Sequence, residues 1–428
     1  MKKRNIVFAL LTMTMLGGCG RQAVSDSTSK SIQALSSEAE SSTETETLTS
    51  PKSDAAGSPE EAMSDLALEL LAQTVKESGE QENILISPTS IELAMGMVQN
   101  GANGDTLDQM EDVLNHGLSI DDMNSAFKDI SDRLESSDDV NWNIANSVWY
   151  KGDGSSTPKS DFIQKTNDWY DAEVFPAPFD DSTVMAINGW VSKETSGMIP
   201  QIISDISPND RMCLINAIAF EGEWEFSYSD DQIRENHIFT NADGSESSVT
   251  TLYSEENDYF ELENGIGFLR PYAGGQYSFF AILPNEGVST ADYIEGLINS
   301  DADLSDALRN TTSEKVCVTM PEFSTDYATE MNKTFIDKGM DIPFDGERAD
   351  FSNMADCPLF ISQVIHSTHM ELNREGTRAA AATAVMMTCL GDAPRQTYKI
   401  IDLNRPFVYG IVDNETGLPI FIGCMNNM

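Results

Sequence analysis

The chain has 428 residues, 40% of them hydrophobic and 8% aromatic, which is enough to build a large core. Its 26 basic residues against 70 acidic ones give a net charge of −44, which excludes nucleic-acid binding by phosphate neutralisation. The six cysteines contain no Cys-x-x-Cys pair and are sparsely spaced. A structural zinc site and a disulfide framework are therefore both unsupported.

The first 18 residues have the composition of a secretory signal peptide. Three basic residues at 2–4 come first, then a mostly apolar stretch at 6–16, then small residues. The stretch is too short for a membrane-spanning helix. Leu16-Gly17-Gly18-Cys19 is similar to the bacterial lipobox, in which the cysteine is lipid-modified and begins the mature chain. A plain signal peptide with an incidental cysteine is the alternative.

Residues 19–60 are predicted to be a lipidated Cys19 followed by a disordered tether. The stretch 21–60 holds 16 serines and threonines, interspersed with acids and without a sustained apolar period. Such a segment buries too little apolar surface to offset its chain entropy. We expect a protein secreted from a bacterial cell, anchored to the envelope by lipid alone and exposed outside the cytoplasm. Loss of residues 1–18 removes three positive charges and no acids, which leaves a net charge near −47.

The remainder, 61–428, is predicted to be one α+β domain. Ser58-Pro59-Glu60-Glu61 combines a capping residue, a first-turn proline and acids, so it predicts a helix start. A second helix is expected after Ser87-Pro88, and a third over 188–199. Strand character is seen over 212–220, 277–283, 316–320, 369–372 and 407–412. No repeat or second linker divides this region.

Enzyme motifs are missing from the sequence. It has no Gly-x-Ser-x-Gly elbow, His-Glu-x-x-His motif, phosphate loop or dinucleotide fingerprint. His366 and His369 lie three apart in a strand-like run, so they should point to opposite faces and not share a metal. Residues 301–306 faintly suggest a calcium loop but lack its glycine. We therefore expect no enzyme activity, cofactor or metal.

Five segments resemble the serpin family. They are Asn83–Ser90 (NILISPTS), Ile187–Ile199 (INGWVSKETSGMI), Leu214–Trp224 (LINAIAFEGEW), the set Met320–Phe323, Gly339-Met340 and Ala349–Ser352, and finally Asn373–Ala382 (NREGTRAAAA) with Arg405-Pro406-Phe407. Because they occur in the family's order and at its separations across nearly all of 61–428, the chain is identified as a member of that family.

The resemblance implies a fold of three β-sheets and eight or nine helices, with a reactive loop exposed above a five-stranded main sheet. The family acts on serine proteases. The protease cuts the loop as a substrate, and the cut loop inserts into the sheet before the acyl-enzyme hydrolyses, which leaves a covalent complex. We expect a monomer whose partners are serine proteases, without nucleic-acid partners.

The loop's first part can be interpreted in two ways. Residues 377–385 are alanine-rich, which by itself favours a helix. Insertion as a central strand instead requires small residues at alternate positions. The resemblance implies a hinge made of Glu375, Gly376, Thr377, Ala379, Ala381 and Thr383. The last four share one phase and are all small and uncharged, and Arg378, the only charge in 377–385, falls in the opposite phase.

The scissile bond is expected about fifteen residues after the hinge glycine, between Leu390 and Gly391. The stretch from Gly376 to Pro406 is longer than is common in the family, so other bonds remain open. The alternatives are Met386, Met387, Thr388 and Cys389, and Arg395 for a trypsin-like enzyme. Cleavage at Arg395 would bring Pro394 into a central strand, where proline cannot donate a hydrogen bond.

Further positions match the family's sheet. Ser87, Ser90, Asn216 and His366 correspond to a polar gate beneath the centre of the main sheet, and Trp224 to its top, where the loop enters. Taken singly, each polar residue is better explained as a hydrogen-bonded buried group, and Trp224 as a core residue, but together they form the gate that the resemblance implies. Arg374 stands where the family usually has glutamate, which puts the usual salt bridge at the loop base in doubt.

The leading hypothesis is a surface-tethered, suicide-substrate inhibitor of elastase-, chymotrypsin- or subtilisin-like serine proteases, since an apolar residue before the bond fits an apolar pocket. A non-inhibitory serpin is one alternative, although the small hinge residues argue against it. A surface-tethered acidic binding or adhesion protein is the other.

Overall fold

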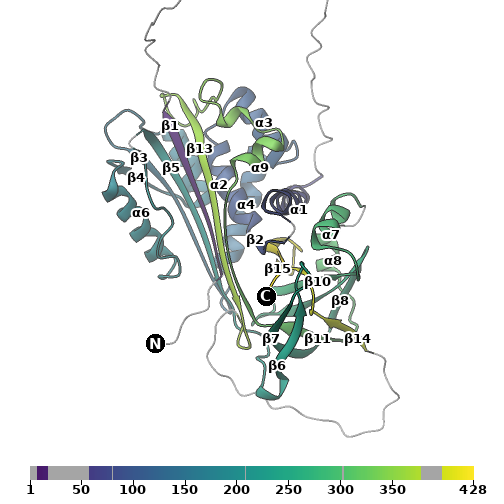
Figure 1. Ribbon diagram of the computed structural model, residues 1–428. Helices are drawn as coiled ribbons and strands as arrows, with labels where there is room; N and C mark the ends of the chain where they lie inside the picture. Colours follow the sequence, from purple (N-terminus) through teal and green to yellow (C-terminus); the bar gives the residue numbers. More distant parts are fainter. Residues whose placement is uncertain (1–6, 18–56, 80, 208, 301–302, 377–397) are drawn as a thin grey trace, which may run out of the picture.

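The fold consists of three β-sheets, with the helices packed against the main sheet and the second sheet (Figure 1). The computed structural model describes residues 7–17, 57–79, 81–207, 209–300, 303–376 and 398–428. Within these ranges there are nine α-helices and two short 3-10 helices, Asp230–Gln232 and Ile342–Phe344. This confirms the predicted α+β class and the number of sheets and helices.

The main sheet has the strand order β12-β13-β1-β5-β3-β4, the second β2-β16-β15-β10-β9-β8, and the third β14-β11-β7-β6. The strands of the main sheet are β12 (Phe323–Glu330), β13 (Leu359–Leu372), β1 (Val7–Gly17), β5 (Asp210–Glu221), β3 (Asn141–Lys151) and β4 (Glu173–Ala177). Those of the second are β2 (Ile84–Ile86), β16 (Pro419–Met425), β15 (Phe407–Asp413), β10 (Tyr277–Pro284), β9 (Gly265–Pro271) and β8 (Asp258–Leu262). Those of the third are β14 (Lys399–Asp402), β11 (Val316–Pro321), β7 (Glu246–Glu256) and β6 (Ile233–Thr240).

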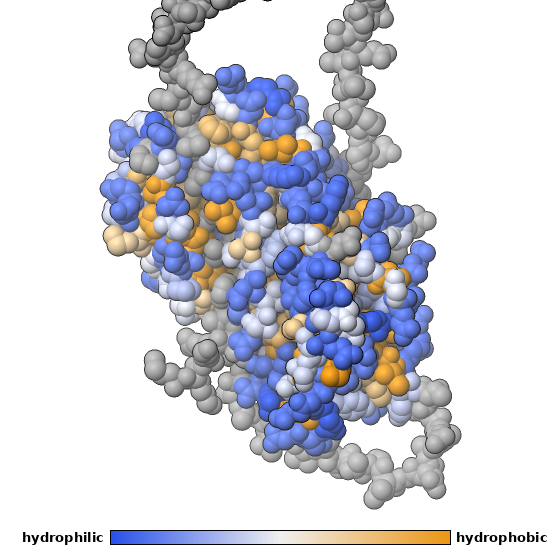
Figure 2. Space-filling model, viewed as in Figure 1, coloured by the Kyte–Doolittle hydropathy of each residue, from blue (hydrophilic) through white to orange (hydrophobic). Residues whose placement is uncertain are grey.

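The helices are α1 (Pro59–Ser78), α2 (Pro88–Gln99), α3 (Gly104–Leu114), α4 (Ile120–Glu135), α5 (Ser160–Tyr170), α6 (Asp181–Glu194), α7 (Thr290–Ile298), α8 (Leu304–Arg309) and α9 (Asn332–Asp337). None of them, among the described residues, is both long and apolar enough to cross a membrane. Figure 2 shows a largely hydrophilic face, as the acidic composition requires.

Capping residues set the helix starts. Ser58 accepts a hydrogen bond from the Glu61 backbone N–H at 3.2 Å, so α1 begins as predicted. Ser87 caps α2 in the same way. The bounds predicted for the third helix, 188–199, were wrong, because α6 begins seven residues earlier, at Asp181. Asp180 caps this helix by accepting a hydrogen bond from the Ser182 backbone N–H at 2.9 Å. It ends at Glu194, since the backbone turns left-handed at Ser196 and Gly197.

Strand β5 is buried on both faces, which explains its continuous apolar sequence. Met212, Leu214, Ile218 and Phe220 point into the large core between the main sheet and the second sheet. The alternate residues belong to a smaller core beneath α6: Cys213, Ile215, Ala217 and Ala219. Helix α2, buried along its whole length, packs on β5 and β16 and so joins the two sheets.

The main sheet has six strands and not the five that the resemblance implies. The additional strand is β1, formed by residues from the predicted export signal, and it lies in the centre of the sheet between β5 and β13 (Figure 1). Without β1 the sheet has the expected five strands.

Candidate functional site

The centre of the main sheet is a strand position that takes a segment from elsewhere in the chain. β1 runs antiparallel to both β13 and β5. At the level of Leu11, the partner on one side is His366 and on the other Asn216. Because both neighbours run antiparallel to β1, they run parallel to each other. We call this position between β5 and β13 the central slot.

Four predicted gate residues meet beneath the central slot. The Ser87 backbone N–H donates to His366 Nε2 at 3.0 Å, and the Ser90 hydroxyl donates to Asn216 Oδ1 at 2.5 Å. The Ser87 hydroxyl donates to the Ile420 carbonyl at 2.8 Å. All four side chains are fully buried. The start of α2 is therefore hydrogen-bonded to both strands that flank the slot.

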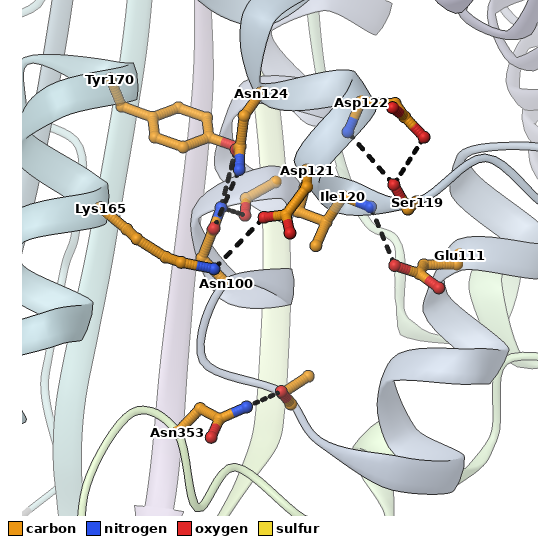
Figure 3. A network of polar contacts seen from close by, with 12 residues as sticks. Asn100, Glu111, Ser119, Ile120, Asp121, Asp122, Asn124, Lys165, Tyr170 and Asn353 are labelled. Atoms are coloured by element: carbon orange, nitrogen blue, oxygen red, sulfur yellow. Dashed lines mark hydrogen bonds and ion pairs between the residues drawn. The ribbon is translucent and has the colours of Figure 1, made fainter.

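The gate continues into residues that the sequence did not single out. Asn216 donates through its amide to Asn146 Oδ1, and Asn146 donates to the Tyr170 carbonyl, both at 2.8 Å. The Tyr170 hydroxyl donates to Asn124 Oδ1 at 2.8 Å, and Asn124 exchanges hydrogen bonds with Asn100 (Figure 3). Burial raises the pKa of Tyr170 well above its usual range. In the sequence, only Asn146 could have indicated this extended cluster, because it is a polar side chain within a buried strand.

Trp224 lies beside the turn that follows β13. Its indole N–H donates to the Asn373 carbonyl at 2.9 Å, and its ring stacks on Tyr272 with centroids 4.8 Å apart. Asn373 and Gly376 pair with each other across a two-residue turn through reciprocal backbone hydrogen bonds of 3.2 Å. The end of β13 thus already turns back on itself at the top of the slot.

Gly376 is required by this geometry. Its φ of +122° is rarely adopted by other residues, and a Cβ there would lie 2.4 Å from the Gly222 carbonyl oxygen. Gly376 also forms a bridge with Glu223. The predicted hinge glycine therefore sits where the chain passes directly over the strand end.

A buried cation supports the top of the sheet. The Arg270 guanidinium lies 3.9 Å from the Tyr228 ring centroid and 5.0 Å from that of Trp224, and it pairs with Glu256 at 2.5 Å. Burial raises the pKa of Tyr228 to about 12. Sequence reasoning missed this cluster, because nothing in a lone arginine marks it as buried.

Arg374, which stands where the family usually has glutamate, contacts two acidic side chains at the loop base. Its guanidinium lies 3.5 Å from Glu322 and 3.8 Å from Asp230, and its backbone N–H donates to Glu322 at 3.1 Å. The loop base is therefore held by ion pairs from Arg374 to Glu322 and Asp230.

Several predicted positions lie outside the described residues: Cys19, the hinge residues Thr377, Ala379, Ala381 and Thr383, and the reactive-bond candidates from Met386 to Gly391 with Arg395. Glu375 is described, and its carbonyl accepts from the Trp224 N–H at 3.4 Å. His366 and His369 face opposite sides, as predicted: His366 is buried, and His369 contacts Asp326 at 2.5 Å. In the described ranges no group of three acidic, His or Cys side chains is arranged for a metal.

Glu92, two residues after Ser90 on α2, carries a buried carboxyl group. It is 4% exposed, and neither of its oxygens has a hydrogen-bond partner among the residues that the structure describes. Burial raises its pKa well above the usual value. The native protein therefore keeps this proton above pH ~4.5 while the unfolded chain releases it. The contribution of Glu92 to the free energy of unfolding is therefore most favourable at low pH. It falls as the pH rises, by at most about 1.4 kcal/mol per pH unit.

Replacing Glu92 with Gln should remove this loss. We expect Glu92→Gln to flatten the decline of the thermal midpoint between pH 5 and pH 8, measured by thermal scans at equal rates. Glu295→Gln, at an exposed position on α7, is the control and should leave the decline unchanged. Equal pH dependence in Glu92→Gln and the unmodified protein would show that Glu92 is not buried as a neutral acid.

Comparisons with known proteins agree with this architecture. The family model described as "Serpin (serine protease inhibitor)" matches residues 61–428. An uncharacterized serpin-like protein of Methanosarcina mazei is 31% identical over 369 residues, 83% of this chain and 84% of that protein. The leukocyte elastase inhibitor A of Rattus norvegicus is 28% identical, over 85% and 97% of the two chains.

Solved structures give the same result. The native state of the thermophilic serpin tengpin superposes with a TM-score of 0.77 at 38% identity, covering 86% of this chain and 93% of tengpin. Its latent state gives a TM-score of 0.74 at 37% identity, covering 86% and 97%. The motifs, the three sheets and these matches agree: this chain belongs to the serpin family of serine protease inhibitors.

Proposed function

We propose that the protein is an inhibitory serpin, which traps a serine protease by inserting its cleaved loop into the central slot. The observation that carries the proposal is the slot itself: the main sheet accepts an antiparallel strand between β5 and β13, directly beside the strand from which the loop continues. A segment that leaves β13 at Leu372 and turns at Gly376 needs only to follow the existing hairpin to fill it.

The pairing of Asn373 with Gly376 sets the register of such an insertion. Extending that hairpin along β13 would bring Thr377 opposite Leu372, Ala381 opposite Thr368 and Thr383 opposite His366. In β13, residues 364, 366, 368, 370 and 372 are buried and the alternate residues are partly exposed. Residues directly opposite in an antiparallel pair share a face.

The inward phase of the loop would therefore consist of Thr377, Ala379, Ala381 and Thr383, all small and uncharged. Arg378 would fall opposite Glu371 on the outer face, where a charge is tolerated. This is the phase that an inhibitory hinge requires, and it favours the strand interpretation of 377–385 over the helix interpretation.

The length of β13 also supports the proposed bond. With the same one-residue irregularity near Ser362 that β1 shows, the inserted segment would reach Leu359, the first residue of β13, at Cys389. Leu390, at the scissile bond, would then stand just beyond the sheet. Cleavage at Arg395 would leave six further residues, including Pro394, without a place in the strand.

Insertion supplies the driving force. A strand with about ten paired residues on each side gains on the order of ten kcal/mol, at a net ~0.5–1.5 kcal/mol per hydrogen bond. The uncut loop cannot insert fully because β13 holds one end and β14, in another sheet, holds the other. Cutting after Leu390 frees one end. The acylated protease would then be carried along the sheet, which distorts its catalytic geometry before deacylation.

The inhibition is tested with elastase- and chymotrypsin-like proteases. We expect an SDS-resistant complex of protease and inhibitor. We also expect a released peptide whose mass corresponds to a fragment that starts at Gly391. A trypsin-like enzyme should form little complex. If the loop is cut but no covalent complex forms with any protease class, the non-inhibitory alternative replaces this proposal. If no protease cuts the loop, the alternative of a surface-tethered acidic binding or adhesion protein replaces this proposal.

The export and anchoring of the protein form part of the same proposal. Cys19→Ser removes the thiol that would carry the lipid, so this variant should lose its membrane fraction and appear in the medium or as unprocessed chain. The measurement is fractionation of cells expressing each form, with Cys317→Ser as the control substitution. A Cys19→Ser protein that sediments with membranes as well as the control would contradict lipid attachment at Cys19.

A further inference from the structure

We propose that residues 7–17, while still attached, act as an internal blocker of the reactive loop. In the structure this segment is the strand that fills the central slot. The inference rests on the proposed insertion of the loop into the same slot. The unprocessed chain would then be inert as an inhibitor, and removal of the leader would create the inhibitory form.

The two segments compete for the same backbone positions. β1 pairs with β13 from Phe8 opposite His369 to Gly17 opposite Leu359. The loop, extended from the Asn373–Gly376 hairpin, would pair with β13 over those residues from Ala380 to Cys389. β1 runs antiparallel to β13 and β5, and the inserted loop would do the same, so the slot cannot hold both.

The leader and the loop are also alike in composition. Residues 7–17 and 379–391 are runs without charge and without proline, as a central strand requires. Met13–Gly17 has the sequence Met-Thr-Met-Leu-Gly, and Met387–Gly391 has Met-Thr-Cys-Leu-Gly. The match is offset by two residues in the register, which preserves the alternation between faces.

Their attachment decides which segment enters first. The uncut loop is tied at both ends, to β13 and to β14, whereas the leader is joined to α1 by residues 18–58, a connection of 41 residues. A segment on a connection of this length can enter the slot without any bond being cut, as β1 does, and its covalent connection keeps its effective concentration high. The leader therefore fills the slot before a protease acts.

Occupation of the slot predicts the fate of the precursor. A protease that cut its loop would find no strand position available, so the acyl-enzyme would hydrolyse and the protease would be released. The precursor would also lack the metastability of the leader-free form, because its sheet already has the full six strands. Both properties are reversed when the leader is removed.

The experiment compares four purified proteins produced in a cytosol, where the leader is retained: three test forms and one control. The first is full-length 1–428 with Cys19→Ala, which prevents processing. The second is leader-free 19–428 with the same substitution. The third is the full-length form with Thr12→Pro, which interrupts backbone hydrogen bonding in the middle of β1. Ala23→Pro, outside β1, is the matched control for the proline.

Two readings are taken on each monodisperse sample: the yield of SDS-resistant complex with a chymotrypsin-like protease, and the thermal midpoint of uncut protein. We expect the full-length and Ala23→Pro proteins to form at least tenfold less complex than the leader-free protein and to unfold at a clearly higher temperature. Thr12→Pro should behave as the leader-free protein does in both readings.

The failures are distinguishable. If the full-length and leader-free proteins trap protease equally, the blocking inference is overturned and the inhibitory function stands. If none of the proteins traps protease but the leader still raises the midpoint and Thr12→Pro abolishes the rise, the leader occupies the slot and the proposed function fails. If the midpoints are equal as well, the inference is overturned.

Discussion

Cleavage of the loop at Leu390–Gly391 should raise the thermal midpoint of the leader-free protein by roughly 20 °C, allowing about 2 °C per kcal/mol for a domain of this size. Cutting a chain normally loosens a protein, because it frees two ends. Here the freed segment can fill the central slot, with a gain on the order of ten kcal/mol in backbone hydrogen bonds. The measurement is a pair of thermal scans before and after limited proteolysis.

Scan rates must be equal in this comparison, since the uncut form can unfold irreversibly. The full-length protein is a useful control: if the leader fills the slot, cleavage of its loop should change the midpoint little. An equal or lower midpoint after cleavage of the leader-free protein would mean that the loop does not insert.

Ala381→Arg should convert the inhibitor into a substrate. In the proposed register Ala381 would face Thr368, which is 2% exposed and donates its hydroxyl to the Leu85 carbonyl. A buried, unpaired charge at this position costs several kcal/mol, so loop insertion slows. The acyl-enzyme is then hydrolysed before the loop has inserted, and the protease is released. We expect cleavage at the same bond with a loss of covalent complex of tenfold or more, measured by the stoichiometry of inhibition.

Ala380→Arg is the matched control for this variant. The same substitution, one residue earlier, would fall in the outward phase opposite His369 and should leave the complex yield close to that of the unmodified protein. If both arginines abolish the complex, or if neither does, then the register extended from Gly376 is wrong.

Much of the fold followed from local sequence rules. Ser58 and Ser87 cap α1 and α2 where predicted, and the alternation of His366 and His369 was confirmed. The start of α6 was missed because Asp180 and Thr183 form its capping box from before the predicted segment. The strand containing His369 was predicted four residues long but extends from Leu359, because its outer-face residues weaken the apolar pattern.

The site was only partly visible in the sequence. The family motifs located Ser87, Ser90, Asn216 and His366, and these side chains do converge on the central slot. The partners that complete the cluster, Asn146 and Tyr170, come from β3 and α5. Tertiary packing alone brings them there, and no local rule links residues so far apart.

The occupation of the slot by residues 7–17 could not have been predicted from patterning. An uncharged stretch without proline is compatible with an export signal and with a central strand alike. The choice between them depends on whether a complementary pair of strand edges is available, and that is a property of the folded sheet.

The most direct test of the account is a crystal structure of the leader-free protein after cleavage at Leu390–Gly391. We predict that residues 377–389 form the central strand of a six-stranded main sheet, with Thr383 level with His366 and Asn216. A structure in which β5 and β13 pair directly with each other, and the cut loop lies outside the sheet, would contradict the insertion mechanism.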